Sequence, residues 1–177
     1  MPKPTWMILI LLMLPLGARA QAQHSHGDIL TADQQDKIAE AGIIPDERIA
    51  LYTKFVNEHA ETIKNLSKRT EAARGHRLDQ ELEDFASLVD ELSSNLDEYG
   101  GRMADLRKSL KGLNEAIPHW QQIVENLPKD GAIQISRDDA RGALKDLADD
   151  AKQLTAKQEA YFKAHKEAKG QQQEEPK

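Results

Sequence analysis

Two histidines near the amino terminus, His24 and His26, are the first residues whose type and spacing could support chemistry. If processing left Ala22 as the first residue of the mature chain, His24 would be the third residue. A free amine, two backbone nitrogens and an imidazole could then surround Cu²⁺ or Ni²⁺ in a square plane. Cleavage after Ala20 instead makes His24 the fourth residue, which spoils that geometry. The alternatives are therefore a metal site at His24 and His26 or two solvated histidines in a polar leader.

A second group of candidate residues contains all three tyrosines and one histidine: Tyr52, Tyr99, Tyr161 and His165. They lie far apart in the sequence, but they would meet if the flanking helices folded back about Gly75 and about residue 131 or 132. The meeting point would lie beside Gly100-Gly101, where the missing side chains permit close approach. Large amphipathic residues also fill wide layers of helical bundles and present a polar tip to water. The group is thus either a ligand site or ordinary packing.

The segment Leu30-Thr31-Ala32-Asp33-Gln34 matches the LTxxQ element and resembles the periplasmic Spy-type chaperones and metal-resistance sensors. Those proteins are also small, exported, all-helical and free of disulfides. The resemblance implies an ATP-independent chaperone that cradles its clients on a helical surface. It covers five residues, and the family usually carries the element twice. The same pattern recurs at Leu154-Thr155-Ala156-Lys157-Gln158.

Sequence signatures of catalysis do not accompany these residues. Metal sites in helical bundles typically use a Glu-x-x-His pair on one helix, and this pair occurs nowhere in the chain. The sequence also lacks a nucleophile–base pairing, a Gly-rich phosphate loop and a haem motif. We therefore expect a protein that is not an enzyme and that carries no cofactor.

The first 20 residues have the features of a secretory signal peptide. Lys3 supplies the positive charge, an apolar stretch runs from Trp6 to Leu16, and Ala18-Arg19-Ala20 is a cleavage site with small residues. An apolar stretch of this length is too short to span a membrane, which takes roughly 20 residues. The sequence predicts a signal peptide over 1–20, a disordered leader over 21–30, a helical domain over 31–169 and a disordered tail over 170–177. We expect an exported protein, periplasmic or extracellular, without a transmembrane segment after signal cleavage.

Charge and cysteine content narrow the possible partners. Cleavage would remove Lys3 and Arg19 and no acidic residue, so the net charge would change from −6 to −8. This balance argues against binding to nucleic acid or to anionic lipid, because both need a basic surface. The chain has no cysteine, so packing alone must hold the exported protein together.

Capping signals and apolar spacing predict the helices that must position these residues. Thr31 is a good N-cap for a short helix over 32–41, and Gly42 is a good stop signal. Pro45 can open a second helix that runs to about Arg74. Ser136, with Asp139 three residues later, resembles a capping box that starts the last helix, which should end at Gly170. His59 and Gln158 fall on inward positions of these helices, where a polar residue commonly sets register.

Between these helices lies a ladder of apolar residues with strict spacing of four and three. Its members are Leu78, Leu82, Phe85, Val89, Leu92, Leu96, Tyr99, Met103, Leu106, Leu110, Leu113, Ile117, Trp120, Val124 and Leu127. A strict seven-residue repeat is typical of a helix that supercoils with partner helices. The register continues through Gly100-Gly101, and Asp97, Glu98 and Arg102 have the wrong signs for helix ends there. We therefore expect one helix roughly 75 Å long, kinked at Pro118.

The expected fold is all-α, an extended antiparallel bundle of coiled-coil type with three main helices. The alternative is a four-helix up-down bundle with a turn at Gly100-Gly101. We expect a non-enzymatic helical protein that acts through protein–protein contact, as a scaffold, a spacer or an assembly subunit, with a protein partner or self-association. The alternatives are the Spy-type chaperone and a metal-handling protein that uses His24 and His26.

Overall fold

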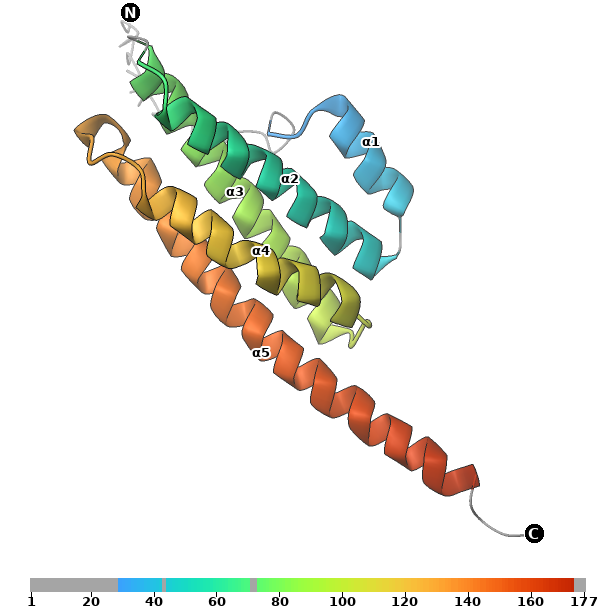
Figure 1. Ribbon diagram of the computed structural model, residues 1–177. Helices are drawn as coiled ribbons and strands as arrows, with labels where there is room; N and C mark the ends of the chain where they lie inside the picture. Colours follow the sequence, from blue (N-terminus) through green and yellow to red (C-terminus); the bar gives the residue numbers. More distant parts are fainter. Residues whose placement is uncertain (1–28, 43, 71–72, 174–177) are drawn as a thin grey trace, which may run out of the picture.

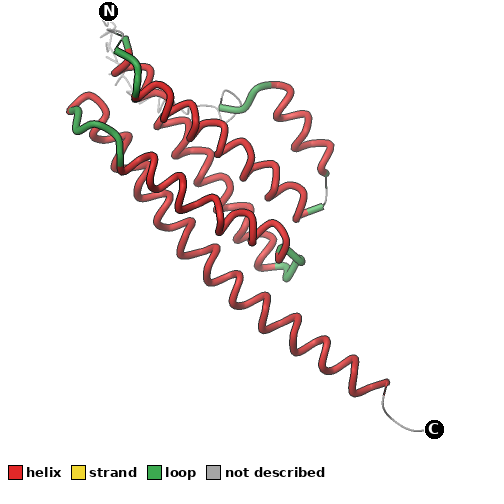
Figure 2. Tube along the Cα trace, in the orientation of Figure 1, coloured by secondary structure: helices red, strands yellow, loops and turns green. Residues whose placement is uncertain are grey.

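The computed structural model describes residues 29–42, 44–70 and 73–173, and the side chains as far as residue 166. Every regular element in these ranges is a helix (Figure 1, Figure 2). In chain order they are α1 (Ala32–Ala41), α2 (Pro45–Ser67), α3 (Arg74–Gly101), α4 (Arg107–Glu125), the short 3₁₀ helix η1 (Gly131–Ile133) and α5 (Gln134–Gln173). None of the helices in the described part of the chain is both long enough and apolar enough to cross a membrane.

Helix α1 begins and ends at the residues predicted from the sequence. The Thr31 side chain accepts a hydrogen bond from the Gln34 amide, and the Gln34 side chain accepts one from the Thr31 amide, which completes a capping box. Gly42 follows the helix with a φ of 54°, a conformation that glycine adopts without steric cost. Among the described elements, α1 packs only against α2, where its residue Ile38 is buried.

Helices α2 to α5 form the main body, a pair of helical hairpins laid on one another. Helix α2 is antiparallel to α3, and α4 is antiparallel to α5, as their side-chain contacts and Figure 1 show. Across the two hairpins, α2 lies parallel to α4, because Asp46 contacts Ser109 and Asn57 contacts Trp120. Helix α3 likewise lies parallel to α5. In the described chain, α3 and α4 do not touch along their lengths, so they occupy opposite corners of the bundle.

The prediction of one continuous helix from Leu78 to Leu127 is wrong. Helix α3 ends at Gly101, residues 102–106 reverse the chain, and α4 begins at Arg107. The alternative, a turn near Gly100-Gly101, agrees with this path. Every member of the ladder except Met103 is nevertheless buried, because the register continues into α4 after the reversal. Pro118 lies inside α4, as predicted, and does not end it.

Two other helix boundaries differ from the predictions. Helix α2 ends at Ser67 instead of Arg74, and Gly75, the expected break, lies in the first turn of α3. Helix α5 begins at Gln134, ahead of the predicted Ser136 cap, because η1 leads directly into it. The helix then continues past Gly170, where a stop was expected, to Gln173.

Helix α5 is much longer than its neighbours and leaves the bundle before it ends (Figure 1). Its first part has buried residues at regular intervals, the last of which is Gln158. Among the described side chains that follow, Tyr161 and Phe162 are half-buried and the others are exposed. We call residues 45–158 the bundle and residues 159–173 the stalk.

Candidate interaction site where α5 leaves the bundle

The stalk begins at a buried glutamine that holds the α3–α4 loop. Gln158 is fully buried, its Oε1 accepts a hydrogen bond from the Leu106 amide at 2.9 Å, and its Nε2 donates one to the Ala104 carbonyl at 2.6 Å. Both main-chain groups lie outside regular helix and would otherwise be unpaired in a buried place. The prediction that Gln158 points inward is therefore confirmed, and its amide fixes the loop to α5.

The loop itself is a Schellman turn with an unusual residue at its central position. The Ala104 amide donates to the Tyr99 carbonyl at 3.1 Å, and the Met103 amide donates to the Gly100 carbonyl at 3.2 Å. Met103 has a φ of 55°, and it is the only residue other than glycine with a positive φ in the described chain. Glycine usually occupies this position, because a side chain there costs roughly 1–2 kcal/mol.

The two glycines before the turn have different surroundings. A Cβ atom on Gly100 would lie 2.8 Å from Cδ1 of Leu154, so the missing side chain lets α3 and α5 approach closely. A Cβ atom on Gly101 would meet no atom within 4 Å. Beside Gly101 is a hollow of about 470 Å³ between α3 and α5, whose polar lining includes Asp97, Asp150 and Lys157.

An aromatic cluster marks the root of the stalk. The ring of Tyr161 stacks against His165, with centroids 3.9 Å apart, and meets Phe162 edge-on at 5.1 Å. The guanidinium of Arg107, at the start of α4, lies 4.2 Å from the centroid of the Phe162 ring, in cation–π geometry. Asp105 holds the same guanidinium, which lowers the pKa of the Asp105 carboxyl. These contacts connect the stalk to the first turn of α4.

The structure brings together only part of the predicted tyrosine group. Tyr161 and His165 stack on each other, as described above. Tyr52 is buried in α2, and its hydroxyl donates to Glu91 at 2.5 Å; burial and this carboxylate raise the pKa of Tyr52 to about 12. Tyr99 lies at the end of α3 with the Arg102 guanidinium 5.7 Å from its ring centroid. The expected meeting of the tyrosines depended on a continuous helix through Gly100-Gly101, and that helix is broken.

The remaining predicted residues have different outcomes. His24 and His26 lie outside the described residues. In the ranges that the structure does describe, no group of three or more acidic or histidine side chains could hold a metal ion. The first LTxxQ match has local roles in α1, since Leu30 is buried and Thr31 and Gln34 form the capping box. In the second match, residues 154–158 of α5, Gln158 is the buried residue that holds the α3–α4 loop.

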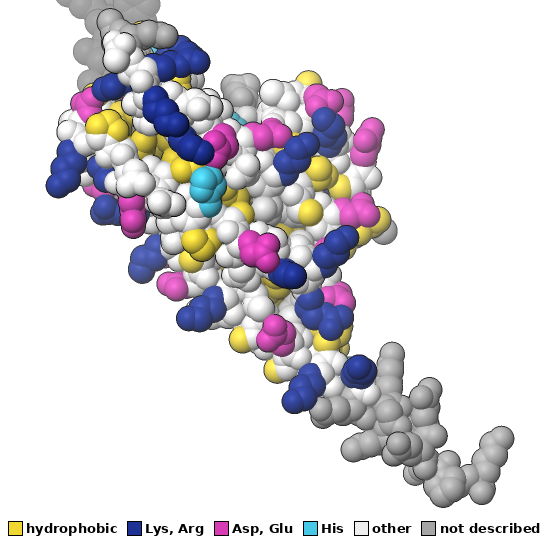
Figure 3. Space-filling view, in the orientation of Figure 1, with side chains coloured by type: hydrophobic (Ala, Val, Ile, Leu, Met, Phe, Trp, Pro, Cys, Tyr) yellow, Lys and Arg dark blue, Asp and Glu magenta, His cyan; other side chains and the backbone are white. Residues whose placement is uncertain are grey.

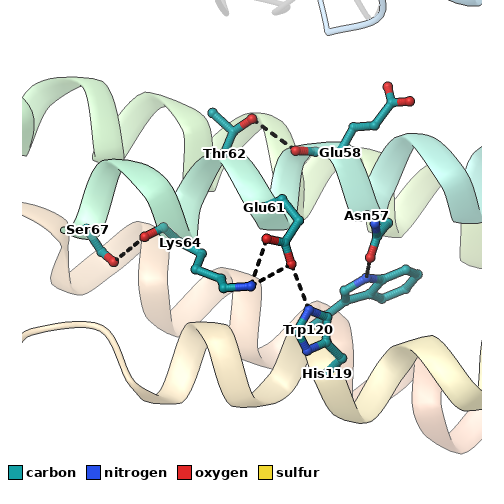
Figure 4. A network of polar contacts seen from close by, with 8 residues as sticks. All are labelled: Asn57, Glu58, Glu61, Thr62, Lys64, Ser67, His119 and Trp120. Carbon is teal, nitrogen blue, oxygen red and sulfur yellow. Dashed lines mark hydrogen bonds and ion pairs between the residues drawn. The ribbon is translucent and has the colours of Figure 1, made fainter. Parts of the chain in front are cut away.

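A second polar cluster lies on the face that α2 and α4 share (Figure 4). The Glu61 carboxylate accepts hydrogen bonds from Lys64 at 2.8 and 2.9 Å and pairs with His119 Nε2 at 2.8 Å. Lys64 and then His119 lower the pKa of Glu61. Next to it, Trp120 donates to Asn57 at 3.2 Å. The Glu61–His119 and Asn57–Trp120 contacts link α2 to α4, and the exposed ion pair of Glu61 with His119 contributes little to stability.

The face seen in Figure 3 carries Lys and Arg side chains interspersed with Asp and Glu, with small apolar patches between them. The sequence of the stalk is slightly basic, because residues 159–173 contain the three lysines 163, 166 and 169 and the two glutamates 159 and 167. Lone lysines on a solvated helix are common. The basic charge is notable here because the chain as a whole is acidic.

Comparison of the chain with protein-family models, curated proteins and solved structures gave no match. Its function must therefore be inferred from the geometry of its own surface.

Proposed function

We propose that this chain is an exported, non-enzymatic helical protein that acts through protein–protein contact, with the stalk as its contact element. The supporting observation is that α5 continues over residues 159–173 beyond its last buried bundle contact, at Gln158. At about 1.5 Å per residue, this segment is roughly 22 Å long.

A single helix of this length gains little from its own hydrogen bonds. Isolated helices shorter than about 12–15 residues are marginal in water, and most helical stability in proteins comes from packing of one face. Among the described side chains of the stalk, only Tyr161 and Phe162 are half-buried, and the ring of Phe162 contacts Arg107 of α4. A partner that covered its exposed face would supply the missing stabilisation.

The side chains at the root of the stalk indicate the chemistry of that partner. Tyr161 and Phe162 are half-buried aromatic residues, and aromatic residues are enriched at protein interfaces. Lys157, Lys163 and Lys166 flank them in the sequence and outnumber the two nearby acidic residues, Glu159 and Glu167. A partner with an apolar groove and an acidic rim would fit both features. The role that follows is that of a spacer or assembly subunit, in which the bundle is held at a distance from the bound partner.

Site-specific photocrosslinking tests this proposal. A photoreactive residue at exposed Ala164, in the full chain expressed in its own cell, should give a defined protein adduct. The double variant Tyr161→Ala, Phe162→Ala should lose that adduct. The matched control is Ile135→Ala, since Ile135 is a large apolar residue that is 79% exposed at the other end of the same helix. Retention of the adduct in the stalk variant, or its loss in the control, would contradict the proposal.

Two further measurements address the rest of the proposal. Amino-terminal sequencing of the protein recovered from the cell envelope should begin at Gln21, and a chain that begins at Met1 in the cytoplasm would contradict export. Suppression of the aggregation of an unrelated unfolding protein at near-stoichiometric ratio, unchanged by the stalk variant, would favour the Spy-type chaperone role instead.

A further inference from the structure

The bundle consists of two complementary halves that one short segment connects. The first half is the α2–α3 hairpin and the second is the α4–α5 hairpin, with residues 102–106 between them. The halves pack through α2 on α4 and α3 on α5, and both contribute to one apolar core. The α4–α5 hairpin therefore covers the inner apolar face of the α2–α3 hairpin. The α4–α5 hairpin of a second copy of the chain could cover the same face.

The connecting segment has the sequence of a helix. Residues 102–106 are Arg, Met, Ala, Asp and Leu, without glycine or proline. The apolar spacing Leu96, Tyr99, Met103, Leu106, Leu110 continues through it with steps of three and four. Most of these residue types favour helix, and only Asp is a weak helix former. A straight helix through this segment would join α3 to α4 without changing which side chains face the core.

In the structure residues 102–106 form a turn, and we call this arrangement the closed form. Some interactions destabilise this turn and others stabilise it. Its cost is Met103, which is held in the left-handed conformation at φ 55°. Its supports are Gln158, which bonds Ala104 and Leu106, and Asp46, which accepts a hydrogen bond from the Ser109 amide at 2.8 Å. A continuous helix would relieve Met103 and would satisfy the loop amides by main-chain hydrogen bonds. The two arrangements thus differ in a few local interactions and share the whole core.

We propose that the inner face of the α2–α3 hairpin is also a docking surface for a second copy of this chain. When residues 102–106 straighten, the α4–α5 hairpin of each copy packs on the α2–α3 hairpin of the other. The dimer remakes every interface of the bundle, and each chain then has one helix over residues 74–125, roughly 78 Å long at 1.5 Å per residue. Exchange of identical elements between two copies is a low-cost route to a dimer. Dimer formation tests the exchange and the stalk adduct tests the proposed function, so either proposal can fail without the other.

Size-exclusion chromatography with light scattering tests the exchange on the full mature chain. After unfolding and refolding at high protein concentration, a dimer should appear and should persist on dilution, because its dissociation requires partial unfolding. Met103→Gly favours the closed turn and disfavours the straight helix, so it should lower the dimerisation constant about tenfold or more. Gln158→Leu removes the two hydrogen bonds that Gln158 makes to the turn and should raise the dimer fraction.

The matched control is Gly101→Ala. Gly101 is helical in the closed form, would be helical in the straight form, and has open space around its Cβ position. The substitution should therefore stabilise both forms alike and leave the dimer fraction unchanged. A chain that stays monomeric after refolding at every concentration would overturn the proposal, as would a Met103→Gly variant with the same dimer fraction as the unchanged chain.

Spin labels distinguish exchange from ordinary association of closed chains. The chain has no cysteine, so the substitutions Glu83→Cys and Gln122→Cys carry unique labels. In the closed form both positions lie near one level of the bundle, because Ser136 contacts Asp79 and its neighbour Arg137 contacts the Glu125 carbonyl. In a straight helix they would lie roughly 58 Å apart.

Doubly labelled chain should therefore be refolded with an excess of unlabelled chain, and the dimer isolated for distance measurement. Exchange predicts that the short distance within one chain disappears from this diluted dimer and that the long distance appears. A dimer that keeps the short distance after dilution consists of closed chains and would rule the exchange out.

Discussion

Helix α5 runs without a break from the bundle into the stalk, but the two parts are stabilised differently. Within the bundle, α5 has fully buried residues such as Ala140, Leu144 and Leu147, and α3 and α4 cover them. In the stalk, the same helix continues with half-buried Tyr161 and Phe162, whose contacts are with each other, His165 and Arg107. Helical form alone is therefore a poor guide to what holds a segment in place.

The difference shows that one helix can carry buried core positions in one part and partly exposed aromatic side chains in another. Where α5 is covered, the buried positions after its first turn are mostly aliphatic, as at Ala140, Leu144, Leu147 and Ala151. Where it is uncovered, they are aromatic or polar, and the surrounding charge becomes basic. The change occurs at Gln158, which closes the core and fixes the loop at the same point.

The largest expected effect comes from removing aliphatic volume in the covered part of α5. Leu147 is fully buried, so Leu147→Ala should destabilise the protein by about 2–5 kcal/mol. Tyr161→Ala, in the stalk, should change the free energy of unfolding by less than about 1 kcal/mol. Urea denaturation followed by circular dichroism measures both. Equal losses would show that the stalk is part of the cooperative core.

The next effect should come from the boundary itself. Gln158→Ala leaves the Leu106 amide and the Ala104 carbonyl without their partner, which should cost about 1–3 kcal/mol. Gln153→Ala, on the exposed side of α5, is the matched control and should change stability by less than about 0.5 kcal/mol. If the two variants unfold at the same urea concentration, Gln158 does not support the loop.

A smaller effect with a distinct pH dependence is expected at Tyr52. Tyr52→Phe removes the hydrogen bond to Glu91 and should cost about 1 kcal/mol at neutral pH. Because the pKa of Tyr52 is raised to about 12, its neutral form is favoured in the folded protein, while the unfolded chain ionises near pH 10. The Tyr52 contribution to stability should therefore be complete below pH 10 and fall between pH 10 and 12.

Urea denaturation at pH 8 and at pH 11 checks this sign. The unchanged protein should lose more stability between the two than Tyr52→Phe does. Tyr99→Phe, which removes a hydroxyl at the end of α3 without affecting Glu91, serves as the control. A loss of stability at high pH that Tyr52→Phe leaves unchanged would assign it to other groups.

The smallest effect on overall stability should come from the stalk, where the change is local. Phe162→Ala removes the cation–π contact with Arg107, which is worth about 0.5–1 kcal/mol at an exposed site. Amide hydrogen exchange should accelerate over residues 159–166 and stay unchanged over α5 residues 140–151. Acceleration across the whole helix would mean that the stalk and the bundle open together.

The elements that could be predicted from the sequence are those whose signals are local. The bounds of α1 follow from Thr31, Gln34 and Gly42, which lie within or next to the helix. Burial of the apolar ladder also follows from spacing alone, because a heptad register is the same in a long helix and in two helices that reverse. The order of the helices and the antiparallel pairing within each hairpin were likewise predictable.

The reversal at residues 102–106 could not be predicted, because its causes are not local. The first turn of α4 is capped by Asp46, 63 residues earlier in the chain, and the loop is bonded by Gln158, more than 50 residues later. The left-handed position of the turn is taken by Met103, whereas the two glycines lie inside α3. The glycine pair beside the turn makes it an alternative, but no residue near it decides between a turn and a continuous helix.

The sizes of the free energies explain why the charges of Asp97, Glu98 and Arg102 do not prevent a break in the helix. Charges of the wrong sign at a helix end cost about 0.3–1 kcal/mol each. Full burial of a large apolar side chain contributes about 1.5–3 kcal/mol, and a layer of four helices buries what a layer of two leaves partly in water. Fully buried Trp120 and Leu113 in α4 show which term is larger. The expected tyrosine group depended on the same argument and failed with it.

The orientation of α5 along its neighbours has a mechanical consequence. The axes of α5, α3 and α4 are nearly parallel to one another, so tension applied to the far end of α5 acts along the length of its contacts with both helices (Figure 1). Such a load is a shear, which must displace a whole row of side chains together, whereas a load across the helices would separate them one turn at a time. The contacts of α5 should therefore resist a load along the helix better than a load across it.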